Sequence, residues 1–190
     1  EPLARLAGPQ TIVISIAAGR TLQSFERFLA PGTAVIRAMP NTPAQVGRGM
    51  TACVANAATS AVQRALATEL LSAVGEVVWV ETEGDIDAVT AVSGSGPAYV
   101  FLLAECLAEA GRRAGLPPET AAKLARATVA GAGELLFRSD LDAATLRQNV
   151  TSPGGTTAAA LGVLMGEPGL QALLTEAVEA AVRRSRELSR

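Results

Sequence analysis

The first half of the chain alternates between short apolar runs and amphipathic segments. Residues 11–16 (TIVISI) are a continuous, mostly β-branched run, which is typical of a strand buried on both faces of a sheet. Residues 59–74 place apolar side chains at four-residue spacing and predict a helix, and residues 22–29 predict a shorter one. Further strands are expected at three apolar runs: 33–39, 50–55 and 77–80. Strands and helices in turn indicate α/β layering.

From about residue 85 the pattern becomes helical. The expected helices cover 86–92, 97–114, 119–137, 141–149 and 170–188, and the Ser-Gly-Ser-Gly-Pro segment 93–97 is expected to break the first from the second. The helix 119–137 is rich in Ala and Gly, although an interior glycine costs up to about 1 kcal/mol relative to alanine. Tight packing of another helix would explain this composition. We therefore expect an α/β part at 1–84, followed by an all-α part at 85–190 that self-associates.

The overall composition excludes several functions. Of the 190 residues 49% are hydrophobic but only 3% are aromatic, and 16 basic residues balance 18 acidic ones, so we expect no nucleic-acid partner. No apolar stretch reaches the roughly 20 residues that span a bilayer, so no membrane partner is expected. Histidine is absent, which removes Ser-His-Asp and Cys-His mechanisms. Cys53 and Cys106 show no metal-type spacing, so we expect no metal. Two cysteines do not form a disulfide framework, so we expect a reducing, cytoplasmic setting. We expect Cys53, Cys106 and Trp79 to have packing roles.

The segment 151–157 (TSPGGTT) precedes an apolar run at 158–161 and predicts a loop that enters a helix. The first N–H groups of a helix lack internal partners and carry partial positive charge, so a carboxylate or phosphate fits there. The two threonines add hydroxyls that can donate or accept hydrogen bonds. The alternative is an ordinary helix cap with a flexible lead-in and no ligand.

Three other loops are candidate binding segments, each with a plainer alternative. Residues 16–19 (IAAG) follow the first strand, at the edge where open α/β sheets bind ligands, unless they are an ordinary turn. In 39–43 (MPNTP), Asn41 offers both a donor and an acceptor, unless the segment is only a rigid connection. Residues 93–97 contain Gly-x-Gly, but helices flank it, which argues against a dinucleotide loop. The residues alone predict a small-molecule binder at a strand-end cleft, with a nucleotide-linked ligand as one option.

Together, four motifs closely resemble those of the pyrroline-5-carboxylate reductase family and occur in that family's order: IAAG at 16–19, RAMPNTP at 37–43, AVSGSGPAY at 91–99 and VTSPGGTT at 150–157. The resemblance covers essentially the whole chain. It implies reduction of the cyclic imine Δ1-pyrroline-5-carboxylate to L-proline by NADPH or NADH. It also implies a Rossmann-type parallel sheet for 1–84 and a helical dimerisation and substrate domain for 85–190. Active sites are then expected between subunits, in a dimer or a ring of dimers.

The same resemblance implies roles for individual residues. Backbone N–H groups around Gly155 would hold the substrate carboxylate, and the Thr157 hydroxyl would meet the ring nitrogen, which makes Thr157 the candidate catalytic residue. The implied substrate-binding residues are Asp140, Ser152, Gly154, Gly155, Thr156 and Thr157, and the implied cofactor-binding residues are Ile16, Ala17, Ala18, Asn41 and Asn149. For Asp140 a helix-capping role after Ser139 is an equal alternative.

The chain departs from the family pattern at its start. The family begins with a strand, a Gly-rich loop and a helix that hold the pyrophosphate, whereas this sequence resembles the C-terminal two-thirds. We therefore expect the chain in isolation to bind dinucleotide poorly and to be inactive. Two alternatives are another Rossmann-plus-helical dehydrogenase, such as a β-hydroxyacid type, and a non-enzymatic helical oligomerisation module. The first generally uses a lysine base, and the single lysine here, Lys123, lies in the middle of a predicted helix.

Overall fold

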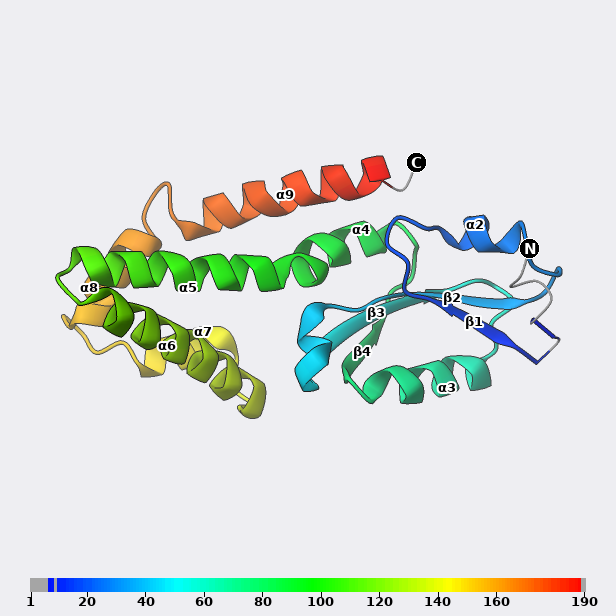
Figure 1. Ribbon diagram of the computed structural model, residues 1–190, viewed down its shortest axis with the longest axis horizontal. Helices are drawn as coiled ribbons and strands as arrows, with labels where there is room; N and C mark the ends of the chain where they lie inside the picture. The colour runs from blue at the N-terminus through cyan, green and yellow to red at the C-terminus, as the bar shows by residue number, and fades with distance from the viewer. Residues whose placement is uncertain (1–6, 9, 189–190) are drawn as a thin grey trace. The chain divides into compact units, whose positions relative to one another are not determined.

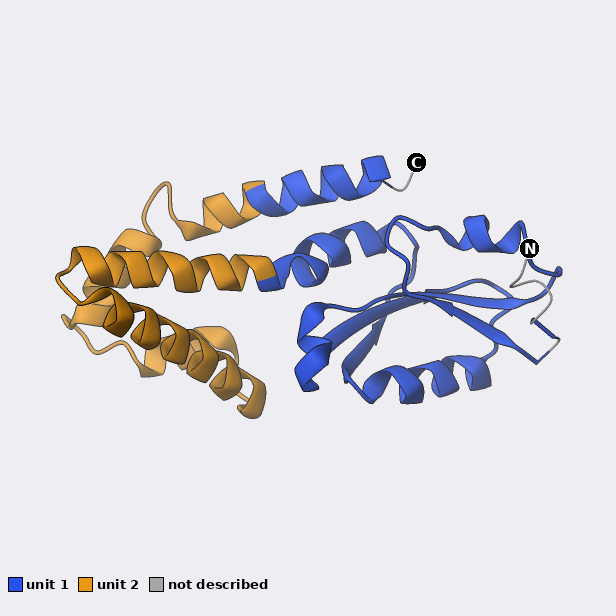
Figure 2. Ribbon diagram, in the orientation of Figure 1, with its two compact units in different colours: residues 1–97, 177–190 blue, residues 98–176 orange. Residues whose placement is uncertain are grey.

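The structure is a computed structural model that describes residues 7–8 and 10–188. The chain forms two compact units, one of residues 1–97 with 177–190 and the other of residues 98–176 (Figure 2). The first unit therefore contains the sheet and the end of the last helix. The predicted domain boundary lies between residues 84 and 85, where the secondary structure changes, and not at residue 97, where the compact units divide. The roles predicted for residues 1–84 and 85–190 remain predictions.

The sheet has four strands in the order β1 (Ile12–Ser15), β2 (Ala34–Met39), β3 (Gly49–Ala55) and β4 (Gly75–Trp79) (Figure 1). The outer pairings, β1 with β2 and β3 with β4, are parallel, and they are joined through α2 (Leu22–Glu26) and α3 (Ala61–Ser72). The central pairing of β2 with β3 is antiparallel. The predicted α/β architecture is confirmed, but its sheet is only mostly parallel. The connection 40–48 is shorter than the dozen or so residues that a parallel crossover needs.

The core lies on both faces of β2 and β3. On one face Ile36, Ala38 and Cys53 pack with Ala67 of α3, and Trp79 packs against this cluster as predicted. On the other face Ala52 and Val54 pack with Ile86 of α4 (Asp85–Val89), so α3 and α4 cover opposite faces. Strands buried on both faces need apolar side chains at every position, which explains the continuous apolar runs.

Cys53 illustrates the burial of this core and gives a first prediction. Its side chain is buried, and this burial raises the pKa of the thiol from 9.0 to about 11. Since only the thiolate is nucleophilic, Cys53 should resist thiol reagents in the native Cys106→Ser variant at pH 8 and should react once denaturant unfolds the chain. Because the folded pKa is the higher one, the stabilisation that the neutral thiol provides is complete below pH 9 and is lost as the pH rises towards 11. Rapid labelling of the native variant would contradict this burial.

Cys106, by contrast, is exposed on α5, and its predicted packing role is wrong for this chain.

The remainder of the described chain is helical, with α5 (Gly96–Arg113), α6 (Pro118–Arg138), α7 (Ala143–Asn149), α8 (Thr156–Leu164) and α9 (Leu170–Leu188). The predicted break at 93–97 is not a break. A π-helical turn, η2 (Thr90–Gly94), carries the chain from α4 into α5, and the N–H of Ser95 donates to the carbonyl of Thr90 at 2.8 Å. One wide turn of this kind accommodates the glycines without ending the helical path.

Within the second unit, α5 and α6 approach closely at one point and are open elsewhere. A Cβ built at Gly111 would lie 3.4 Å from the Cβ of Ala121, so glycine allows the contact. At Gly131 and Gly133, in contrast, a Cβ would meet no described atom within 4 Å. The helix expected to pack across these glycines is therefore not supplied by the described chain. A groove of about 640 Å³ between α5 and α6 is lined by Val100, Phe101 and Val129 among others.

The helical run 85–113 also bears on the predicted absence of a membrane span. It contains an 18-residue window with a mean hydropathy of at least 1.2 and at most two charged residues. By length and composition alone it is long and apolar enough to cross a bilayer, contrary to the expectation from the sequence. A single helix of this kind is weak evidence, because helices in the cores of soluble proteins pass the same test.

Candidate functional site

The Gly154–Thr157 turn leads directly into α8, and each of its glycines has a physical reason. Gly154 has a φ of +68°, a conformation that side chains with a Cβ rarely adopt. Gly155 is the N-cap of α8, and a Cβ built there would fall 2.5 Å from the Oγ of Ser152. The N–H of Gly155 donates to the carbonyl of Ser152 at 3.1 Å, which closes the turn. The sequence therefore fixes a tight turn with an open backbone.

The N-terminus of α8 is not capped by a side chain. The first bond into the helix runs from the N–H of Ala159 to the carbonyl of Gly155 at 3.1 Å, and no side-chain oxygen of the described chain accepts from the preceding N–H groups. The N–H groups of Thr156, Thr157 and Ala158 are therefore free to meet an external acceptor. The side-chain cap that the alternative prediction expected from Ser or Thr is absent at this turn, and ligand binding there stays a prediction. By comparison, Ser60 caps α3 through its hydroxyl.

The residues expected near this turn lie in the same compact unit. Asp140 and Ser152 are exposed, and Asn149 is the last residue of α7. The capping alternative for Asp140 is wrong, because Asp142 is the N-cap of α7 and accepts from the N–H of Thr145 at 2.8 Å. This hydrogen bond also lowers the pKa of the Asp142 carboxyl. Thr157 is half-buried, and its hydroxyl bonds to no described residue.

The predicted cofactor-binding residues Ile16, Ala17 and Ala18 lie in the compact unit that contains the sheet. There β1 and β2 run parallel, so their carboxyl ends lie at the same edge. Ile16 is 64% exposed directly after β1, and the Ser15 hydroxyl accepts from the N–H of Ala17 at 3.2 Å. Ala17 and Ala18 offer little more than backbone, which leaves room for a flat ring. This edge is where open α/β sheets bind ligands.

Asn41 belongs to the same edge, but its side chain is already occupied. Its Oδ1 accepts from the N–H of Met50 at 2.9 Å, and its Nδ2 donates to the carbonyl and the hydroxyl of Ser93, each at 3.2 Å. The side chain thus joins the β2–β3 connection to η2. A cofactor contact by Asn41, which remains a prediction, would most simply use its backbone.

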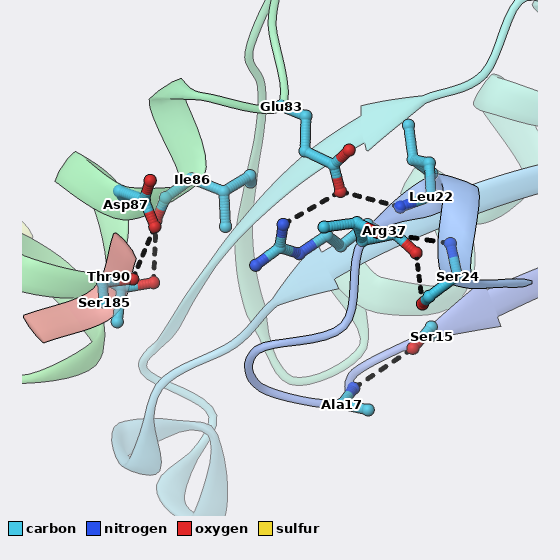
Figure 3. Close-up of polar contacts among 11 residues, drawn as sticks. Ser15, Ala17, Leu22, Ser24, Arg37, Glu83, Ile86, Asp87, Thr90 and Ser185 are labelled. Atoms are coloured by element: carbon cyan, nitrogen blue, oxygen red, sulfur yellow. Dashed lines mark hydrogen bonds and ion pairs between the residues drawn. The ribbon is translucent and has the colours of Figure 1, made fainter. Parts of the chain in front are cut away.

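Sequence reasoning missed a buried ion pair beside this edge. Arg37 of β2 has a side chain only 6% exposed, and its Nη1 donates to the Oε1 of Glu83 at 2.9 Å (Figure 3). The same oxygen accepts from the N–H of Leu22 at 2.8 Å, so Glu83 links β2 to the start of α2. The signal available in the sequence was a single arginine inside the otherwise apolar run 33–39.

The two parts define a class of protein. A mostly parallel sheet with small residues at its strand ends, joined to helices one of which begins without a side-chain cap, is the arrangement of two-part nucleotide-linked oxidoreductases. Comparison with known families identifies the member. The family model for pyrroline-5-carboxylate reductase dimerisation matches residues 83–188. The chain belongs to the pyrroline-5-carboxylate reductase family, as its motifs predict.

Similar proteins support this assignment over the whole chain. The pyrroline-5-carboxylate reductase of Pseudomonas aeruginosa is 46% identical over 189 residues, which cover 100% of this chain and 69% of the relative. The solved reductase of Coxiella burnetii is 42% identical with a TM-score of 0.93, covering 100% of this chain and 70% of that one. A Plasmodium falciparum pyrroline carboxylate reductase, solved with NADP bound, is 31% identical with a TM-score of 0.81, covering 100% and 74%.

The family assignment decides between the alternatives left by the sequence. A β-hydroxyacid-type dehydrogenase is excluded, and the helical part corresponds to a region that the family uses for dimerisation. The chain therefore carries a self-association region. The open Gly131 and Gly133 positions of α6 are consistent with this, because a second chain can pack where the described chain does not.

Proposed function

We propose that this chain supplies the substrate turn, the nicotinamide edge and the self-association region of a reductase that converts Δ1-pyrroline-5-carboxylate to L-proline. The observation that carries the proposal is the uncapped N-terminus of α8, with three free N–H groups beside the half-buried Thr157. A substrate of this class has one carboxylate and one imine on a small ring. The turn offers a separate partner for each group.

The carboxylate binds at the free N–H groups of Thr156, Thr157 and Ala158. Hydrogen bonds to a charged group contribute about 1.5–3 kcal/mol each, and the helix dipole adds about 0.3–1 kcal/mol. Gly154 and Gly155 allow close approach because no Cβ stands between the ligand and the backbone. Ser152 and Asp140 complete the proposed substrate contacts from the same unit.

The Thr157 hydroxyl serves the imine nitrogen. An imine is basic enough to be protonated before it is reduced, so a hydroxyl that donates or shares a hydrogen bond suffices. This fits a chain without histidine. The main task of the protein is then to hold the ring in one orientation, which can itself lower the barrier by several kcal/mol, or up to about 7–11 kcal/mol in favourable cases.

The strand-end edge fits the flat end of NADPH or NADH. Ile16 is exposed and the two alanines after it present backbone, so a planar ring can lie against them. The residues that we propose to hold the cofactor are Ile16, Ala17, Ala18, Asn41 and Asn149. When bound, the reduced nicotinamide supplies the hydride that the C=N carbon accepts.

The proposed assembly is a dimer or a ring of dimers in the cytoplasm, without a membrane partner. The apolar groove between α5 and α6 and the open glycines of α6 would be covered by a second copy. This cover explains why the 85–113 run is apolar enough to resemble a membrane span.

A spectrophotometric assay of the intact gene product tests the proposed reaction. Oxidation of NADPH at 340 nm should depend on added Δ1-pyrroline-5-carboxylate and should yield L-proline in equal amount. A preparation without the imine is the control. A non-enzymatic oligomerisation module would self-associate but show no imine-dependent oxidation, and that result would overturn the proposal.

A further inference from the structure

A small cavity lies beside the strand-end edge, entirely within the compact unit that contains the sheet. It has a volume of about 220 Å³, and its walls come from the loop after β1, from β2, from η2 and from the end of α9. Liquid water occupies about 30 Å³ per molecule, so this volume suits a ligand about as large as a small amino acid. None of the residues that form the α8 turn lines it.

The guanidinium of Arg37 lines this cavity and is only partly paired. Its Nη1 is fixed by Glu83, and Nη2 and Nε form no hydrogen bond with any other described residue. Among the described residues, no fully buried side-chain nitrogen or oxygen lacks a partner. The free nitrogens of Arg37 therefore keep some accessible surface, although the side chain as a whole is only 6% exposed, and Arg37 lines the cavity. Figure 3 shows Glu83 holding one side of the guanidinium.

The charges that line the cavity have one sign. Arg37 and Arg184 contribute guanidinium groups. The Nη1 of Arg37 donates to Glu83 and the Nη1 of Arg184 donates to Glu187 at 2.7 Å, but neither carboxylate lines the cavity. Ser95 adds a hydroxyl that bonds to no other described residue. A partly enclosed space lined by guanidinium donors and a free hydroxyl, with both carboxylate partners outside its lining, favours an anion.

We propose that this cavity is a second binding site, which takes a small monocarboxylate on the free Nε–Nη2 edge of Arg37. That edge presents two parallel N–H donors, the geometry that matches the two oxygens of a carboxylate. Glu83 holds the guanidinium at Nη1, which leaves the Nε–Nη2 edge for the ligand. Ser95 and Arg184 contribute the remaining hydrogen bond and charge. Ala18, one of the proposed cofactor residues, also lines the cavity, but Arg37, Ser95 and Arg184 have no part in the proposed reaction, so the site goes beyond it.

Acetate provides the probe, because it carries the carboxylate with almost nothing else. We expect titration of acetate into the 15N-labelled chain to move the Nε–Hε signal of Arg37 and the amide signals of Gly19 and Ser95 in a saturable way. Acetamide, which has the same shape without the charge, should leave these signals in place. L-proline is titrated in parallel. Shifts with both acetate and L-proline would support the site and identify the reaction product as a ligand. Shifts with acetate alone would support the site and indicate another small acid as its ligand.

Matched variants separate this site from general charge effects. Arg37→Lys keeps a cation beside Glu83 but loses the two-donor edge, so it should weaken acetate binding about tenfold or more. Ser95→Ala should weaken it about fivefold and Arg184→Gln about threefold. Arg183→Gln is the control, because this side chain is 67% exposed against 65% for Arg184, sits next to it on α9, and does not line the cavity. It should leave binding unchanged.

The outcomes decide the proposal without reference to reductase activity. Absence of saturable shifts in the unmodified chain would overturn it, as would shifts confined to the amides of residues 155–157. Equal weakening by Arg183→Gln and Arg184→Gln would reduce the effect to overall charge and would also overturn it. If Arg37→Lys does not fold, the Ser95→Ala and Arg184→Gln measurements decide.

Discussion

Replacing Thr157 with alanine in the intact enzyme is expected to lower the turnover number about 100-fold. Positioned groups that transfer or share a proton contribute about 10²–10⁴-fold to a reaction. The hydroxyl of Thr157 is half-buried beside the free N–H groups of α8 and bonds to no described residue, so it is available to the imine nitrogen. Steady-state kinetics with saturating NADPH and varied imine measure the effect. The Michaelis constant for the imine should change much less, because in the proposed binding mode the backbone N–H groups of the variant hold the carboxylate as before.

Two controls define the cause of this loss. Thr157→Ser keeps a hydroxyl at the same position and should restore most of the turnover. The free energy of unfolding of Thr157→Ala should stay within about 1 kcal/mol of the unmodified protein, as expected for a change that creates no buried unpaired group. Turnover that is unchanged in Thr157→Ala would remove this residue from the mechanism.

Replacing Gly75 with alanine is expected to reduce the free energy of unfolding by about 3–5 kcal/mol, in the range of exceptional single substitutions. Gly75 has a φ of +149°, and a Cβ built there would fall 2.0 Å from the carbonyl oxygen and 2.4 Å from the nitrogen of Gly49. These are backbone atoms of the paired strand, because Gly49 and Gly75 form the first register pair of β3 and β4. Alanine could fit only if the start of β4 separated from β3. Urea unfolding curves of the two proteins measure the difference.

Gly32→Ala is the matched control for this prediction. Gly32 has a φ of +84°, so alanine there carries backbone strain, but its Cβ would meet nothing within 4 Å. Its expected cost is about 1–2 kcal/mol. If Gly75→Ala costs no more than Gly32→Ala, the close contact between β3 and β4 does not exist in solution.

The pattern of apolar positions predicted the strands and most helices because it reports burial and periodicity. It predicted 33–39 and 50–55 as strands, which the structure has as β2 and β3, both largely buried. It could not predict that these two strands run antiparallel, since burial on both faces looks the same in either direction. The length of the 40–48 connection carried that information. The π-helical η2 was missed for a related reason: Ser93 and Gly94 are typical of breaks, whereas Asn41, far away in sequence, holds the turn in place.

For the candidate site, the local turn was easier to predict than contacts between distant segments. The two glycines and two threonines at 154–157 predicted a loop that enters a helix from neighbouring residues alone, and α8 begins there; whether its start was capped could not be decided from the sequence. Whether Asp140 or Asp142 caps α7 depends on the residue at which the helix begins, and the structure has Asp142 as the cap. A sequence pattern does not locate a helix start to within two residues. The Arg37–Glu83 pair joins residues 46 positions apart, and no local rule brings them together.

The reversal between β2 and β3 also separates the edge proposed to bind the nicotinamide from an edge available for engineering. The carboxyl ends of β1 and β2 lie at one edge, while Ala55, the last residue of β3, pairs with Ile36 and leads away towards the other. The exposed residues Ala57 and Ala58 follow directly. A fluorescent reporter inserted between them would therefore stand apart from both the nicotinamide edge and the Arg37 cavity, and would leave their loops intact in a biosensor for small acids.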